Sequence, residues 1–146
     1  MTNTSQQKLK IAFASSNNID LDEHFGTCFS LCIYALTRSD SEHLNTVLLS
    51  REEGHQQQKI SDRLLALEDC FAVYCLACGN PVRRQLLAQG TRVIIQSTSE
   101  PIANLLMGIQ NNWPGQIAQR QLRQRRKKQD ADYFEKLADG EWDEQN

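Results

Sequence analysis

The first third of the chain alternates apolar positions with polar or small ones. Residues 9–15 (LKIAFAS) and 28–36 (CFSLCIYAL) both have the period of two that indicates a β-strand, and Phe29 falls on the apolar face of the second. A polar turn at 39–42 (SDSE) and a third candidate strand at 45–52 (NTVLLSRE) follow. Because the connections are short, the pattern predicts an antiparallel meander.

The apolar spacing then changes to that of alternating helices and strands. Residues 59–70 have the period of an amphipathic helix, and 71–77 (FAVYCLA) form a continuous apolar run, typical of a central strand covered on both faces. A helix at 80–90, a second buried strand at 91–96 and a helix at 100–110 follow. Strand–helix–strand units require parallel pairing, so we expect an α/β fold with a mixed five-stranded sheet and helices on both faces.

The composition of the chain changes at its two ends. We expect a disordered tail at 1–8, an α/β domain at 9–112 and a helical extension with an acidic end at 113–146. The extension contains six basic residues without an intervening acid: Arg120, Arg123, Arg125, Arg126, Lys127 and Lys128. Because no aromatic residues alternate with them, we favour a solvated helix face that pairs with acidic groups of a partner over a nucleic-acid surface.

Charge and hydropathy exclude several classes of protein. The formal net charge is −2, which gives no case for wholesale binding to nucleic acid or membranes. No apolar run approaches the roughly 18 residues of a membrane helix, and the polar start resembles no secretory signal. We therefore expect a cytoplasmic protein, and a monomer. In that compartment its five cysteines are free thiols or metal ligands, and a single CxxC does not supply a four-thiolate zinc site.

A histidine and a cysteine lie close together in the loop after the first strand. His24 and Cys28 are both possible metal ligands, and Gly26 between them permits a close approach to the backbone. Loops that follow strands are where α/β proteins tend to bind ligands. The same residues also fit a histidine that bonds a local backbone group and a thiol that belongs to the interior. The spacing alone leaves both interpretations open.

A second candidate follows the predicted central strand. Cys75 lies within that strand, whereas Cys78 lies at its end, beside Gly79 and a helix for which Asn80 is the expected N-cap. A helix N-terminus offers free N–H groups to an anion. If the first and central strands are parallel neighbours, this loop faces that of His24. A sizeable anionic ligand could then lie between the two loops.

The sequence gives little support to an enzyme. Asp20, Asp22 and Glu23 could hold a divalent ion, as in a relic of a nuclease, but they share one loop, whereas such sites collect carboxylates from several elements. The chain has no phosphate-binding glycine loop, no G-x-S-x-G and no H-E-x-x-H motif. We therefore expect no catalytic activity.

Residues 10–36 resemble the opening of the dinitrogenase iron–molybdenum cofactor-binding family. They contain a first strand, a loop, the tripeptide His24-Phe25-Gly26 and a strand that ends in an aromatic residue, Tyr34.

Residues 59–94 are similar to the second half of that family, with Arg63 on a helix, Asp69-Cys70 before a strand and Gly79 after it. The tail, with Trp113 and residues 133–144 (YFEKLADGEWDE), looks most like one branch of the family, which comprises small carriers in nitrogenase cofactor biosynthesis.

The resemblance implies a ribonuclease-H-like fold without nuclease activity, in which the first and fourth strands are in parallel contact. It implies a carrier that binds and transfers an iron–sulfur cluster precursor or the iron–molybdenum cofactor. It also implies cofactor-assembly proteins as partners, namely a scaffold and a cluster-synthesising enzyme. Because relatives often carry aliphatic or small residues at positions 75 and 78, His24 is the first candidate ligand.

The expected site therefore combines residues from both loops. Cluster contacts are expected from His24, Phe25, Gly26, Gly79 and Asn80, and metal ligation from His24, with Cys28 and Cys78 as further candidates. The alternative function is an interaction module that docks on cofactor-assembly proteins through the basic helix and binds no cluster itself.

Overall fold

The structure is a computed structural model that describes residues 7–49 and 56–138. Residues 1–6 of the predicted tail and 139–146 of the predicted acidic end lie outside the described residues. Contacts within the chain group it into two compact units, the first ending at Trp113 and the second starting at Pro114.

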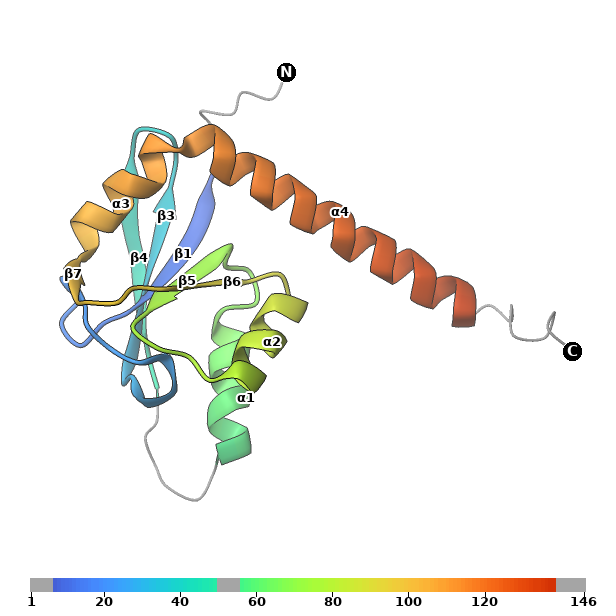
Figure 1. Cartoon of the computed structure of the whole chain (residues 1–146), viewed down its shortest axis with the longest axis horizontal. Helices are drawn as coiled ribbons and strands as arrows, with labels where there is room; N and C mark the ends of the chain where they lie inside the picture. Colours follow the sequence, from blue (N-terminus) through green and yellow to red (C-terminus); the bar gives the residue numbers. More distant parts are fainter. Residues whose placement is uncertain (1–6, 50–55, 139–146) are drawn as a thin grey trace, which may run out of the picture. The chain divides into compact units, whose positions relative to one another are not determined.

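A mixed five-stranded sheet forms the centre of the first unit (Figure 1). Its strands are β1 (Leu9–Ala14), β3 (Ser30–Leu36), β4 (Ser41–Leu48), β5 (Ala72–Cys75) and β6 (Arg92–Ile95). The order across the sheet is β4-β3-β1-β5-β6. The β1–β3 and β3–β4 pairs are antiparallel, whereas the β1–β5 and β5–β6 pairs are parallel. The predicted meander and the parallel contact between the first and central strands are both confirmed.

Helices pack on both faces of this sheet. In Figure 1, α1 (Gln56–Ala66) and α2 (Asn80–Ala88) lie together on one side of the strands, and α3 (Ile102–Asn111) lies on the other. A short antiparallel pair, β2 (Asp20–Leu21) with β7 (Glu100–Pro101), joins the loop after β1 to the start of α3. The predicted fold class is thus confirmed.

The central strands β1 and β5 are almost entirely apolar because both of their faces are covered. Every residue of β5 is buried, as is every residue of β1 except Lys10. Phe13 stacks on Tyr74 of β5 with 5.2 Å between ring centroids, and contacts Tyr34 of β3 edge-on at 5.9 Å. Such aromatic pairs add to the free energy gained by removing the rings from water.

The predicted position of Phe29 in the core is wrong. Its side chain is 51% exposed, whereas Cys28 beside it is fully buried. β3 starts only at Ser30, after the loop, and it is covered on both faces, so alternation could not indicate which residues face inward. The predicted turn at 39–42 is also shorter than expected, because β4 begins at Ser41. Residues 50–52 of the predicted third strand lie outside the described residues.

Two further details differ from the sequence-based expectation. β6 is an edge strand and not a buried one, since Val93 is buried but Ile95 is 42% exposed. The N-cap of α2 is Gly79, and Asn80 is the first helical residue, with no side-chain cap bond. Gly90, expected just past the end of this helix, does have the positive φ (96°) that favours glycine.

The long helix α4 (Trp113–Ala138) contains the basic run. Pro114 lies in its first turn, where a missing N–H removes no helical bond, so the proline marks the start of the helix. The six basic side chains are exposed except those of Arg120 and Arg123, which are half-buried. Within the described ranges, no helix is both long enough and apolar enough to cross a bilayer.

Candidate functional site

Two backbone hydrogen bonds join the loop after β1 to the segment after β5. The amide of Leu76 donates to the carbonyl of Glu23 at 2.9 Å, and the amide of Phe25 donates to the carbonyl of Ala77 at 2.8 Å. His24 lies between these bonds in an extended conformation. The two loops named as candidates from the sequence are therefore brought together, at the carboxyl ends of two parallel strands.

The His24-Phe25-Gly26 tripeptide has one buried side chain between two exposed residues. Phe25 is 1% exposed and begins the short 3-10 helix η2 (Phe25–Thr27). His24, Gly26 and Thr27 are exposed. Burial of the phenyl ring holds the turn against the core, and the imidazole remains on the surface.

A buried arginine bonds the same turn on the side that faces the core. Arg63 of α1 is 2% exposed, and its Nε donates to the Phe25 carbonyl at 3.2 Å while Nη2 donates to the Cys28 carbonyl at 3.0 Å. The role of this arginine at the site was not predicted from the sequence. A signal was available, since Arg63 lies between Ile60 and Leu64 on the apolar face of the helix, where a charged residue needs buried partners.

The Cys28 thiol faces the interior. It is fully buried, and Sγ donates to the Phe25 carbonyl at 3.2 Å. Burial raises the pKa of this thiol, against the opposing effect of the Arg63 guanidinium. A thiol that donates a hydrogen bond carries its proton, so Cys28 stabilises the turn in its protonated form.

The two cysteines of the CxxC sequence have different environments. Cys75 is fully buried, and burial raises its pKa to about 12, with smaller effects from Cys78 and Cys28. Cys78 is half-buried; burial raises its pKa as well, and the Arg83 guanidinium lowers it. Of the thiols near the two loops, Cys78 is thus the accessible one. Among the described residues, no three His, Cys, Asp or Glu side chains gather as a metal site.

Both loop glycines lie in open space. A Cβ added at Gly26 or at Gly79 would meet nothing within 4 Å, and neither residue has a positive φ. Packing and backbone conformation within the chain therefore explain neither glycine. The open space beside the two glycines leaves room for another molecule to approach the backbone closely.

The start of α2 adds positive potential beside these glycines. Its N-cap, Gly79, provides no side-chain bond to the first turn, and Pro81 has no N–H of its own. The Arg83 guanidinium is exposed and close enough to Cys78 to lower the pKa of that thiol. A helix N-terminus and an arginine both favour an anion at this place.

The carboxylates of the loop after β1 are engaged in turn formation. Asp22 accepts hydrogen bonds from the amide (2.9 Å) and the hydroxyl of Ser16, and Asp20 accepts one from the Asn17 side chain at 3.2 Å. These bonds fix the turn that leads to β2. Turn formation therefore accounts for Asp20 and Asp22 without the divalent ion that the sequence suggested for these two residues and Glu23.

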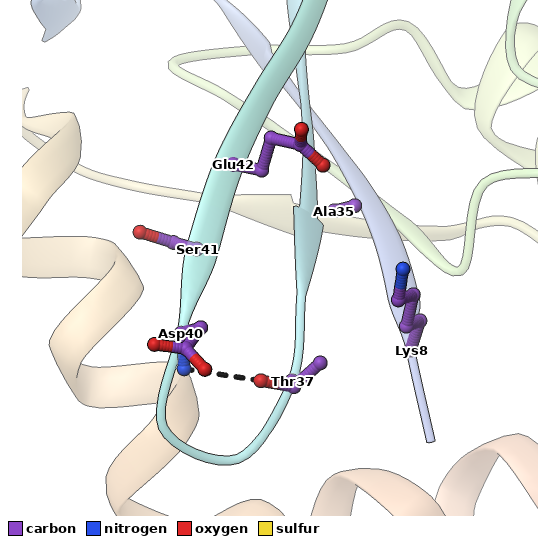
Figure 2. A pocket seen from close by; sticks show the side chains of 6 residues that line it. All are labelled: Lys8, Ala35, Thr37, Asp40, Ser41 and Glu42. Carbon is purple, nitrogen blue, oxygen red and sulfur yellow. Dashed lines mark hydrogen bonds between the residues drawn. The ribbon is translucent and has the colours of Figure 1, made fainter. Parts of the chain in front are cut away.

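A shallow cavity of about 210 Å³ lies at the opposite end of the sheet (Figure 2). It is lined by Lys8, Ala35, Thr37, Asp40, Ser41 and Glu42. The hairpin that forms it is held by bonds of the Gln110 amide to the carbonyls of Thr37 and Asp40, both at 3.0 Å. Because β1 runs from this end towards His24, the cavity is separate from the two joined loops.

Comparison with known proteins decides the family. Residues 7–112 match the model of the family described as dinitrogenase iron-molybdenum cofactor. The chain belongs to this family. The matched region ends one residue before α4 begins, so the cofactor-family region contains both loops of the site, and the basic helix follows it.

Relatives within the dinitrogenase iron-molybdenum cofactor family resemble the chain over most of its length. The protein NifX of Klebsiella pneumoniae is 36% identical over 143 residues, covering 97% of this chain and 89% of that protein. The protein NifX of Azotobacter vinelandii is 38% identical over 103 residues, covering 70% of this chain and 65% of that protein. The chain is therefore NifX-like, and the branch of the family to which its tail was expected to belong is confirmed.

The crystal structure of PH0822 shares the fold. It aligns with a TM-score of 0.57 and covers 73% of this chain and 98% of that one. At 14% sequence identity, this likeness supports the arrangement of strands and helices and carries no conclusion about the site.

Proposed function

We propose that this protein binds an iron–sulfur cluster precursor of the iron–molybdenum cofactor, or the cofactor itself, and transfers it during nitrogenase cofactor biosynthesis. It acts as a carrier and does not transform its cargo. Membership of the cofactor family and the likeness to two NifX proteins support the biosynthetic role. The observation that carries the site is an exposed histidine on one of two joined loops, each of which has a glycine with open space beside it.

His24 is the proposed protein ligand to a cluster metal. A neutral imidazole suits iron, and the exposed side chain can reach a bulky cargo without rearrangement of the core. Gly26 and Gly79 leave room for the cargo against the backbone, and Asn80 at the start of α2 offers an N–H to sulfide or carboxylate. Phe25 holds the loop in place. Cys28 is fully buried with a raised pKa, so we assign it to the loop and not to the cargo.

Few protein ligands suit a carrier, because cargo must leave as readily as it binds. The half-buried Cys78 could contribute a second contact, but its raised pKa disfavours the thiolate form. One imidazole with backbone N–H groups and the nearby arginine would give a moderate affinity, near micromolar, or about −8 kcal/mol. The exposed position of the two loops would let a recipient protein approach the bound cluster directly.

Cofactor-assembly proteins are the proposed partners, a scaffold protein and a cluster-synthesising enzyme among them. The basic helix α4 favours docking on an acidic surface, since six cations occur in nine residues without an acid. This observation also supports the second candidate function, a docking module that carries no cluster. The two functions differ in whether the isolated protein takes up iron.

Anaerobic mixing with isolated iron–molybdenum cofactor tests the proposal. After gel filtration, the native protein should retain iron, and His24→Ala should lose most of it while its circular dichroism spectrum is unchanged. His43→Ala is the matched control, because this other exposed histidine lies on β4 and bonds Thr46 at 3.1 Å. Equal iron in all three proteins would contradict the role of His24, and iron in none would favour the docking module.

A further inference from the structure

Arg63 makes the same loop dependent on α1. Its guanidinium bonds the carbonyls of Phe25 and Cys28, which lie three residues apart and enclose η2. The first of these carbonyls also accepts the Cys28 thiol. The two carbonyls at the ends of the turn are therefore bonded on their buried side by one planar group with two donors of fixed geometry.

The loop has a second anchor on its other side. The bonds Leu76–Glu23 and Phe25–Ala77 join it to the backbone after β5. Along the chain, His24 lies between the two bonds of this second anchor, and Gly26 lies between the two carbonyls that Arg63 bonds. Phe25 takes part in both, since its amide bonds Ala77 and its carbonyl bonds Arg63.

We infer that Arg63 is a positioning residue, whose planar two-donor guanidinium fixes the loop that presents His24 and Gly26 to an anionic metal–sulfur ligand. Only the ligand-binding part of this inference rests on the proposed function. The geometric part concerns the free protein. A lysine at position 63 would keep the positive charge but would replace the fixed fork with a single ammonium group on a flexible chain.

The positive charge of Arg63 also acts on groups of the loop. It opposes the effect of burial on the pKa of the Cys28 thiol. An anion on the outer side of the turn would therefore be attracted by the same guanidinium. Geometry and charge are separable, because lysine preserves one of them and methionine preserves neither.

Hydrogen exchange of the free protein tests the positioning role. In Arg63→Lys and in Arg63→Met, the amides of Phe25 and Leu76 should exchange at least about tenfold faster, because one of the two anchors is lost. Amides in the pairing of β1 with β3 should keep their native rates. Arg38→Met is the control for charge, since Arg38 is an exposed residue of the turn between β3 and β4.

Binding of tetrathiomolybdate, a small metal–sulfur dianion, tests the link to the ligand. Both Arg63 variants should bind it about tenfold more weakly than the native protein, and Arg38→Met should bind it normally. Native exchange rates in Arg63→Met would overturn the inference, as would native exchange and binding in Arg63→Lys, which would leave charge as the only role. If Arg63→Met does not fold, Arg63→Lys and Arg63→Gln decide in the same way.

The two arms separate this inference from the proposed function. Faster exchange in the variants, without tetrathiomolybdate binding by any of the proteins, would support positioning by Arg63 and contradict an anion site at the loop. Native binding that persists in every variant would overturn the role of Arg63 in ligand binding while leaving the site itself intact.

Discussion

Replacement of Gly26 by alanine should raise stability and lower cargo binding at the same time. The added methyl group would touch nothing within 4 Å in the free protein, and the φ of Gly26 is not positive. Gly→Ala at a compatible position stabilises by about 0.4–1 kcal/mol, because the unfolded chain loses conformational freedom. For a unit of this size we expect a rise of about 2–6 °C in the melting temperature.

The opposite effect on binding follows from the same open space. If the cargo approaches the backbone at Gly26, the methyl group occupies part of its position, and affinity should fall by about tenfold, or 1.4 kcal/mol. Calorimetry measures the first effect, and iron retention after anaerobic gel filtration measures the second. A substitution that raises stability and weakens binding together is rare outside a binding site.

Two other glycines are controls for Gly26→Ala. Gly108 lies on α3, where a Cβ also meets nothing within 4 Å, so Gly108→Ala should stabilise by about 1 kcal/mol without a change in binding. Gly90 has a φ of 96°, so Gly90→Ala should destabilise by roughly 1–2 kcal/mol. Native cargo affinity in Gly26→Ala, or equal losses in Gly26→Ala and Gly108→Ala, would refute the close approach.

Two further predictions concern the thiols and the basic helix. Burial raises the pKa of Cys32 to about 11 and those of Cys70 and Cys75 to about 12, so above pH 9 the unfolded chain loses protons that the native protein keeps. Stability should be fully present below pH 9 and should fall as pH rises from 9 to 11, by up to about 1.4 kcal/mol per unit for each thiol; urea unfolding measures this, and a flat profile would contradict it. Deletion of residues 116–146 should abolish binding to cofactor-assembly proteins, measured by pull-down, and leave iron uptake intact, measured by iron analysis. Partner binding that persists after the deletion would argue against electrostatic docking, as would binding by the full chain that does not weaken with salt.

Much of the sheet could be predicted because residues 9–15 alternate in hydropathy and residues 71–77 form a continuous apolar run, and both patterns are typical of strands. β1 and β5 lie between other strands of the sheet and are almost entirely buried, so their sequences fit few structures other than a strand. The errors occur where tertiary position overrides local pattern. Phe29 has the spacing of a core residue but precedes the strand, and β6 has a buried composition but lies at an edge.

At the site, the sequence indicated that the two loops belong together but did not reveal how they are held. Parallel pairing of two strands was enough to place His24 near Gly79, since carboxyl ends of parallel strands lie at one edge. The role of Arg63 depends on carbonyl groups 35 and 38 residues away, which no local pattern reports. Likewise, the difference between Cys28 and Cys78 is one of burial, and spacing in the sequence does not determine burial.

Mapping the cargo onto the backbone amides would show whether the two joined loops are its binding site. In an isotope-labelled protein loaded with an iron cluster in a paramagnetic state, amides near the metal lose their NMR signals. We expect signals to vanish first at residues 23–27 and at the amides of 77–80 and 82, with those around Thr37 and Asp40 retained. Loss centred on the hairpin cavity or on α4, with the two joined loops unaffected, would contradict it.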